Sequence, residues 1–160
     1  AEWIRYGKAR ALGAVAGMVA GLGTITPASG FVGPAGALVI GMSAGFICFN
    51  ATVFLKQKLG VDDSLDVFPV HGVGGALGTI LAGVFASKSL GIFSGQGDGL
   101  PMGEQVLIQL TGVGAVVLYT IALTFVILKI IDMVVGLRVA EDEETEGLDI
   151  NQHNERGYDL

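Results

Sequence analysis

Charge and cysteine are both scarce in this sequence of 160 residues. Charged residues make up 15% of the chain, whereas a typical soluble domain has about 25%, so the composition argues against an ordinary soluble domain. Cys48 is the one cysteine, which excludes an internal disulfide and a CxxC metal or redox motif. The sequence also lacks a P-loop, a dinucleotide fingerprint and a Ser/His/Asp catalytic order. We therefore expect neither an enzyme nor a bound cofactor or metal.

Hydrophobic residues and glycine are abundant instead. Hydrophobic residues account for 51% of the chain, and 26 of the 160 positions are glycine. The mean hydropathy is +0.65. The usual share of glycine is about 7%, and the G-X-Y period of collagen is absent. Glycine within apolar segments is typical of helices that approach closely in lipid. The composition therefore predicts an all-α integral membrane protein that contacts the lipid bilayer.

Four apolar stretches are long enough to cross the hydrocarbon core, which takes about 20 residues. The expected transmembrane spans are 11–29, 34–55, 67–87 and 105–136. The first two form one uncharged run, 11–55, and two prolines with neighbouring breakers divide it near residues 26–34. The last span exceeds the bilayer requirement, so it tilts or projects into water. Residues 1–10 are expected to be a cytoplasmic loop or the end of an upstream helix, and 137–160 a tail.

The basic residues predict the orientation of these spans. Three of them, Arg5, Lys8 and Arg10, precede the first span, and Lys56 and Lys58 follow the second. The loops on the opposite side hold one lysine, Lys88. Short cytoplasmic loops carry such an excess, so both ends of the chain are expected in the cytoplasm. The chain begins without Met and without a signal-peptide pattern, and we expect it to be part of a longer protein.

The net charge of −6 comes entirely from the end of the chain. Residues 1–137 hold seven basic and seven acidic residues, whereas 138–160 hold eight acids and two arginines. This distribution excludes a nucleic-acid-binding surface and predicts an acidic regulatory tail.

Small residues recur every four positions in the first three spans. These stripes are Gly13, Gly17 and Gly21; Gly41 and Gly45; and Gly74 and Gly78. Each stripe lies on one helical face and is expected to let a neighbouring helix come close.

His71 is the most informative residue, because it lies about one turn inside the third span. Gly74, Gly75 and Gly78 follow at i+3, i+4 and i+7, so we expect the ring on the closely packed face, away from lipid. Ionisable groups in a membrane are costly, and the default interpretation is functional; a structural histidine bonded to a carbonyl is the alternative. A neutral imidazole offers one donor and one acceptor, which suits a small polar molecule or a proton relay.

Asp63 and Asp66 come just before the third span, beside Asp62 and Ser64. Carboxylates at this place satisfy the free N–H groups of a helix start and complement its dipole. They also fit an acidic vestibule that attracts cations, and both interpretations remain open.

The segment Asp66-Val-Phe-Pro-Val-His71-Gly-Val-Gly-Gly resembles a motif in the tenth helix of the ammonium transporter family (Amt/Mep/Rh). Residues 17–32 resemble the family's eighth helix and following turn, 61–66 its loop into helix ten, and 136–149 its cytoplasmic tail. The resemblance covers the whole chain in order. It implies the end of helix seven, helices eight to eleven and the tail of an eleven-helix, homotrimeric channel of the plasma membrane.

The resemblance also implies roles for individual residues in passing ammonium or ammonia. His71 corresponds to the second of two pore histidines, whose partner lies in the fifth helix. Val67 corresponds to an apolar pore wall and Thr26 to a possible lining position, while Asp63 and Asp66 correspond to the inner vestibule and helix start. Ammonium is costly to bring into a dry channel as an ion, so ammonia with a separately carried proton crosses more easily.

The tail is implied to couple subunits and to receive a PII-family (GlnK-like) regulator. Its candidate residues are Gly136, Arg138, Asp149, His153 and Tyr158. The alternative is an acidic tail that only solvates the chain and packs on a neighbouring subunit. His153-Asn154-Glu155 departs from the family's His-Gly-Glu, and Pro69 stands where a small residue is common. An ammonium sensor signalling through the tail and a non-conducting membrane fragment are the alternative functions.

Overall fold

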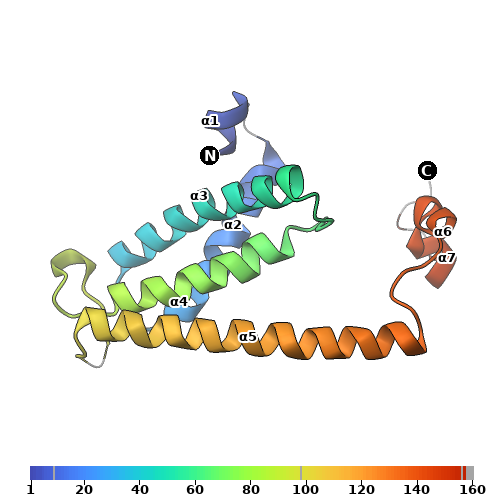
Figure 1. Cartoon of the computed structure of the whole chain (residues 1–160). Coiled ribbons are helices and arrows are strands. Elements are labelled where there is room, and N and C mark those ends of the chain that lie inside the picture. Colours follow the sequence, from blue (N-terminus) through green and yellow to red (C-terminus); the bar gives the residue numbers. More distant parts are fainter. Residues whose placement is uncertain (9, 98, 156, 158–160) are drawn as a thin grey trace. The chain divides into compact units, whose positions relative to one another are not determined.

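The computed structural model describes residues 1–8, 10–97, 99–155 and 157, and these contain helices and no strand (Figure 1). The all-α class that we predicted is therefore confirmed. Two compact units divide the chain, residues 1–115 and residues 116–160, and each is described by itself.

The first unit begins with the short helix α1 (Glu2–Tyr6), followed by α2 (Ala11–Ile25). A 3-10 turn, η1 (Thr26–Ala28), closes α2 at the expected break in the uncharged run. Helix α3 (Pro34–Lys58) starts on a proline, where a missing N–H has no helical partner to lose. It extends three residues beyond the expected span, to Lys58, and long lysine side chains can bury their stems while the charge stays in water.

The third span combines two helical types. A π-helical segment, η2 (Phe68–Val73), leads directly into α4 (Gly74–Phe85), and the 3-10 turn η3 (Gly91–Phe93) follows in the loop. Helix α5 (Met102–Val134) runs for 33 residues and carries the chain from the first unit into the second. The tail forms two short helices, α6 (Glu141–Glu146) and α7 (Leu148–His153).

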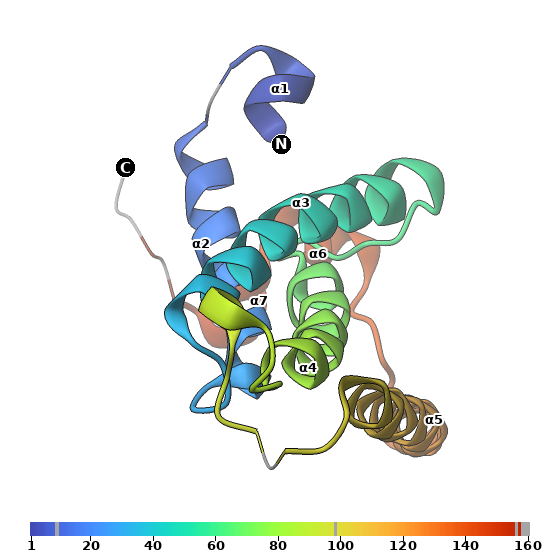
Figure 2. The ribbon, with the colours of Figure 1, turned by 90° about the vertical axis from the view of Figure 1, so that its left-hand side faces the viewer.

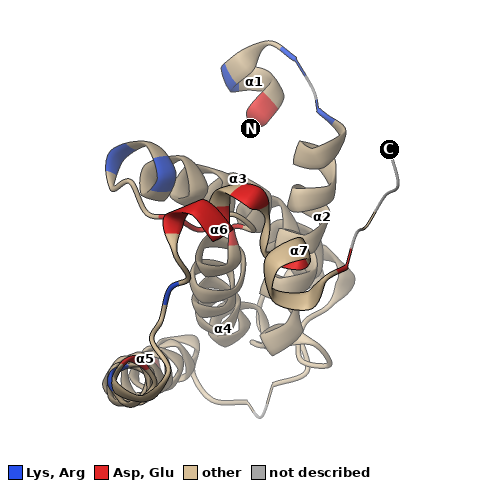
Figure 3. Cartoon of the chain, turned by 90° about the vertical axis from the view of Figure 1, so that its right-hand side faces the viewer, with Lys and Arg blue, Asp and Glu red and all other residues tan. Residues whose placement is uncertain are grey.

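Four described helical segments are long and apolar enough to cross a membrane, as predicted. They cover Ala11–Ala28, Pro34–Lys58, Phe68–Phe85 and Met102–Val134. Most of the length of these four segments is free of charged residues. Figure 3 shows Lys and Arg in α1 and at one end of α3, and Asp and Glu on α6.

Helices α2, α3 and α4 lie side by side in Figures 1 and 2 and enclose a small core. One apolar cluster contains Ala28, Ile40 and Ala82, and another contains Ala20, Cys48 and Val70. Most of these buried side chains are small, so the helix backbones come close together.

The glycine stripes are used unequally. A Cβ on Gly78 would collide with the carbonyl oxygen of Thr24, and one on Gly74 would lie 2.7 Å from the Thr24 hydroxyl. The close approach predicted for this stripe is therefore confirmed. The other two stripes are mostly open in the described chain, because Cβ atoms on Gly17, Gly21, Gly41 and Gly45 would meet nothing within 4 Å, so close approach there stays a prediction. Periodicity identifies a smooth helix face, but it does not say whether this chain itself covers that face.

Candidate functional site

The start of the third span is held by the side chain of Asp63. Its two carboxylate oxygens accept hydrogen bonds from the backbone N–H groups of Phe68, at 2.8 Å, and Val67, at 2.9 Å. These bonds from Phe68 and Val67 hold the pKa of the Asp63 carboxyl below its ordinary value. The structure thus gives Asp63 the capping role, which was one of its two interpretations.

Asp66 connects the same helix start to α3. Its Oδ1 lies 2.8 Å from Nζ of Lys56, in the last turn of α3. The backbone of Asp66 is left-handed, with φ at +56°, a region in which Asp is enriched among non-glycine residues. Its carbonyl accepts the N–H of Val70 at 3.0 Å. One residue therefore supplies both an ion pair and a backbone bond to the helix start.

The π-helical turn determines where the next side chains point. Pro69 and Val70 are buried, and the buried line continues through Gly74, Gly78 and Ala82. His71 directly follows this line and is exposed, although its Nδ1 would be 3.7 Å from a Cβ placed on Gly23 of α2. The buried position that we expected for His71 is thus not observed in this chain. The ring lies near α2 on one side, and the described helices leave its other side open.

Val67 and Thr26 differ in how they meet the rest of the chain. Val67 is half exposed, and its N–H donates to Asp63. Thr26 is also exposed, and its hydroxyl donates to the carbonyl of Leu22 at 2.7 Å. This bond leaves the oxygen of Thr26 with free acceptor capacity. The structure therefore leaves all three candidate pore residues, His71 included, on open surface of the described chain.

Sequence reasoning missed a buried polar residue, Thr24. Its side chain is fully buried at the junction of α2, α3 and α4. A Cβ on Gly74 would lie 2.7 Å from its hydroxyl oxygen and 3.2 Å from the sulfur of Cys48, so the three residues meet at one point. A hydroxyl two residues before a turn gives no signal in the sequence, because threonine is also common at such places for local backbone bonding.

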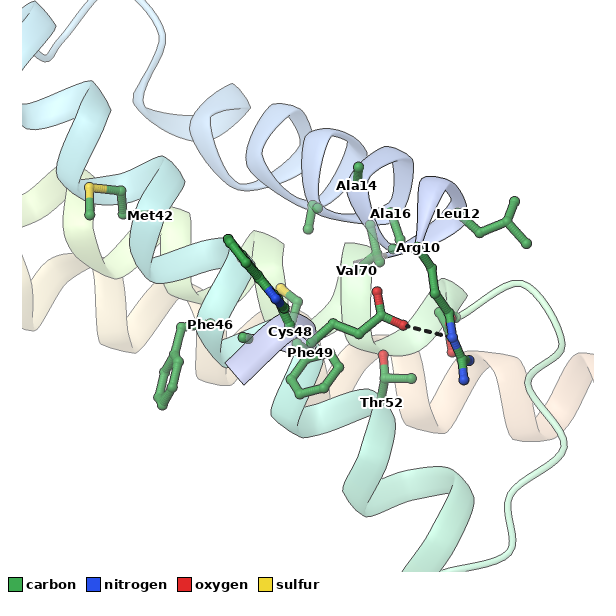
Figure 4. Close-up of a pocket in the computed structure, with 18 of the residues that line it drawn as sticks. Arg10, Leu12, Ala14, Ala16, Met42, Phe46, Cys48, Phe49, Thr52 and Val70 are labelled. Carbon is green, nitrogen blue, oxygen red and sulfur yellow. Dashed lines mark ion pairs between the residues drawn. The ribbon is translucent and has the colours of Figure 1, made fainter. Parts of the chain in front are cut away.

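A pocket of about 650 Å³ is shown in Figure 4. Its walls are mostly apolar and come mainly from α2 and α3, with Asp66 and Val70 also in the lining; the residues labelled in the figure include Leu12, Ala14, Ala16, Met42, Phe46 and Phe49. Arg10 and Glu2 form an ion pair at its margin, with 3.8 Å between Nε and Oε1. His71 does not line this pocket, so the pocket does not contain the candidate pore residues.

The tail has internal order of its own. Arg138 donates from one nitrogen to both carboxylate oxygens of Glu144, at 2.7 and 3.0 Å. Gly136 adopts a φ of +87° after α5, the carbonyl of Asp149 accepts the N–H of Glu155, and His153 ends α7. Tyr158 lies outside the described residues.

No group of three or more His, Cys, Asp or Glu side chains that could hold a metal ion is found among the residues that the structure describes. The candidate chemistry at the third span is therefore that of one imidazole beside a helix start organised by two carboxylates.

Comparison with known proteins gives one consistent result. A model described as the Ammonium Transporter Family matches residues 1–158. A protein of Bacillus subtilis named "Ammonium transporter" is 44% identical over 159 residues, with 98% of this chain covered. A protein of the same name from Aquifex aeolicus is 47% identical, with 99% covered. "Ammonium transporter Amt1" of Archaeoglobus fulgidus is 42% identical, with 98% covered.

These relatives are much longer than the chain. The alignments cover 39%, 37% and 39% of the Bacillus, Aquifex and Archaeoglobus proteins, respectively. The described helices therefore correspond to well under half of each relative.

Proposed function

Because this chain belongs to the ammonium transporter family, we propose that its four apolar helices form part of a pathway that carries ammonium or ammonia across the plasma membrane. The relatives' names and the family match support the substrate. The four helices support a multi-pass membrane protein. The activity is that of a transporter rather than an enzyme.

His71 is the residue proposed to act on the substrate. The single observation that carries this assignment is an ionisable ring in an apolar span, next to the backbone of α2 at Gly23 and open on its other side. Ionisable groups at such a depth mark ion pathways and proton relays. A second histidine from the rest of the protein is proposed to face the open side, so that the pair holds ammonia and passes the proton.

The other proposed roles follow from position along the same span. Val67, one turn before His71, is proposed to form apolar wall, with Thr26 as a lining residue at the end of α2. Asp63 keeps a negative charge at the helix start, which attracts cations to the mouth of a channel. Asp66 contributes less to this attraction, since Lys56 neutralises it.

The assembly proposed is a homotrimer with both ends of the chain in the cytoplasm. The positive residues near the first two spans support this orientation. Residues 136–160 are proposed to receive a PII-family regulator through groups that include Gly136, Arg138, Asp149, His153 and Tyr158. The bidentate pair between Arg138 and Glu144 supports a tail with a defined shape for such a partner.

Uptake by the full-length protein containing this chain tests the proposal. In proteoliposomes, His71→Ala is expected to lower proton-linked ammonium flux by about 100-fold, within the range for losing a positioned acid–base group. His153→Ala, which removes the tail histidine, is the matched control and is expected to keep the flux. Unchanged flux and selectivity in His71→Ala, with the trimer intact, would exclude the proposed role of the ring.

A further inference from the structure

The loop between α3 and the π-helical turn is spanned by one ion pair. Lys56 belongs to the last turn of α3, Asp66 lies just before η2, and their charged atoms are 2.8 Å apart. The side chains are 38% and 26% exposed, so water screens the pair only in part. The contact is an ion pair without a hydrogen bond to Asp66 Oδ1 among the described residues, and it links the end of one helix to the start of the next.

The backbone of Asp66 makes this contact relevant to the helix. Its left-handed conformation is disfavoured for most side chains and has to be maintained by neighbouring contacts. In this conformation its carbonyl accepts the N–H of Val70 at 3.0 Å. The ion pair therefore holds the residue whose carbonyl accepts the N–H of Val70, inside the π-helical segment.

Few other bonds can fix that start. Pro69 has no N–H, so the first donors available are those of Val67, Phe68 and Val70. Two of them are bonded to Asp63 and the third to Asp66. The position of the first turn thus depends on the Asp63 carboxylate and the Asp66 carbonyl, and Lys56 links the Asp66 side chain to α3.

His71 lies immediately after the residues that this arrangement anchors. Pro69 is fully buried, and Val70 packs in a cluster with Ala20 and Cys48. A shift or rotation at Asp66 is carried to the ring through one short, tightly bonded turn. π-turns of this kind are frequent at functional sites.

We propose that Lys56 and Asp66 are positioning residues, and that their ion pair sets the orientation of the His71 ring. The inference rests on the proposed function of His71 and assigns these two residues a part in its selectivity. Neither side chain has to touch the substrate.

The test measures ammonium flux and the ammonium-to-potassium selectivity of the full-length protein in proteoliposomes. Lys56→Met and Asp66→Asn each remove the ion pair, and Asn tolerates the left-handed backbone. Misplacement of a reacting group by about 1 Å costs up to about 100-fold in rate, so each variant is expected to lose selectivity by about threefold or more. Lys56→Arg, which keeps the ion pair, is expected to retain the native selectivity. Lys58→Met and Asp62→Asn are matched charge controls.

A double variant separates positioning from a general structural role. Interacting residues give non-additive effects, so Lys56→Met is expected to cause no further loss of selectivity once His71→Ala is present. A further loss there would overturn the proposal, as would native selectivity in both Lys56→Met and Asp66→Asn. If His71→Ala itself keeps native flux and selectivity, the proposed function fails and this inference fails with it. If His71→Ala is defective while the pair variants are native, only this inference fails.

Discussion

At the residue scale, the carboxylate of Asp63 caps the start of the third span. Asp63 accepts hydrogen bonds from two backbone N–H groups at the start of the span. The first N–H groups of a helix have no acceptor within the helix, and the carboxylate provides one. Its lowered pKa is a consequence of these bonds, because they favour the charged form of the carboxyl. The stabilising effect is therefore tied to the protonation state of Asp63.

The pH dependence of stability tests this link. Because the folded-state pKa of Asp63 is lowered, its contribution is present above the ordinary Asp pKa of about 3.9 and is lost as the pH falls through the folded value. We expect Asp63→Ala to lower the Tm in detergent at pH 7, and the difference from wild type to narrow near pH 3. Asp62→Ala, whose parent carboxylate bonds only the nearby Ser64 among the described contacts, is the control. A difference that is constant with pH would contradict the capping role.

At the element scale, the structure is organised by the approach of α4 to α2. Gly78 and Gly74 leave room for the backbone and hydroxyl of Thr24, so the backbones of the two helices come close together. Lipid provides no hydrophobic drive between helices, and such close packing is what holds them together.

A methyl group at this contact is expected to force the helices apart. Gly78→Ala places its Cβ against the Thr24 carbonyl, and overpacking of this kind costs about 1–3 kcal/mol. Denaturant unfolding in detergent measures the loss. Gly75→Ala, on the same helix with nothing within 4 Å of its Cβ, is expected to be neutral or stabilising. Equal stability of the two variants would show that the contact carries no weight.

The elements themselves were largely predictable from the sequence, but the site was not. The four apolar helices followed from hydropathy, and the break near Pro27 and Pro34 followed from the prolines. The π-turn could not be predicted from the sequence, since its bonding pattern depends on tertiary contacts rather than on residue type. The exposure of His71 was also missed, and the pairing of Lys56 with Asp66 was missed because it bridges two helices across a loop.

At the scale of the whole molecule, the chain spans well under half the length of the relatives it matches, and residues 138–160 are its most acidic part. The tail contains α6 and α7, a φ of +87° at Gly136, and the pair between Arg138 and Glu144. These features give residues 136–153 a local shape that a partner could recognise.

Removal of the tail tests that recognition. Deleting residues 138–160 from the full-length protein is expected to weaken binding of a trimeric PII-family protein by at least about tenfold, equivalent to about 1.4 kcal/mol. A pull-down or calorimetric titration measures the binding. Ammonium flux without the regulator serves as the control, because the apolar helices are untouched. Equal binding by the truncated protein would rule out the tail as the receptor site.

Helix α2 contains four glycines among its fifteen residues. Each glycine lowers helix propensity by about 1 kcal/mol relative to alanine, and a helix of this length is already marginal in water. In hydrocarbon the balance reverses, since an unwound backbone finds no competing hydrogen-bond partner there. Extraction into an aqueous phase is thus expected to unfold this helix, so the surrounding solvent, more than the helix's own residues, keeps it helical.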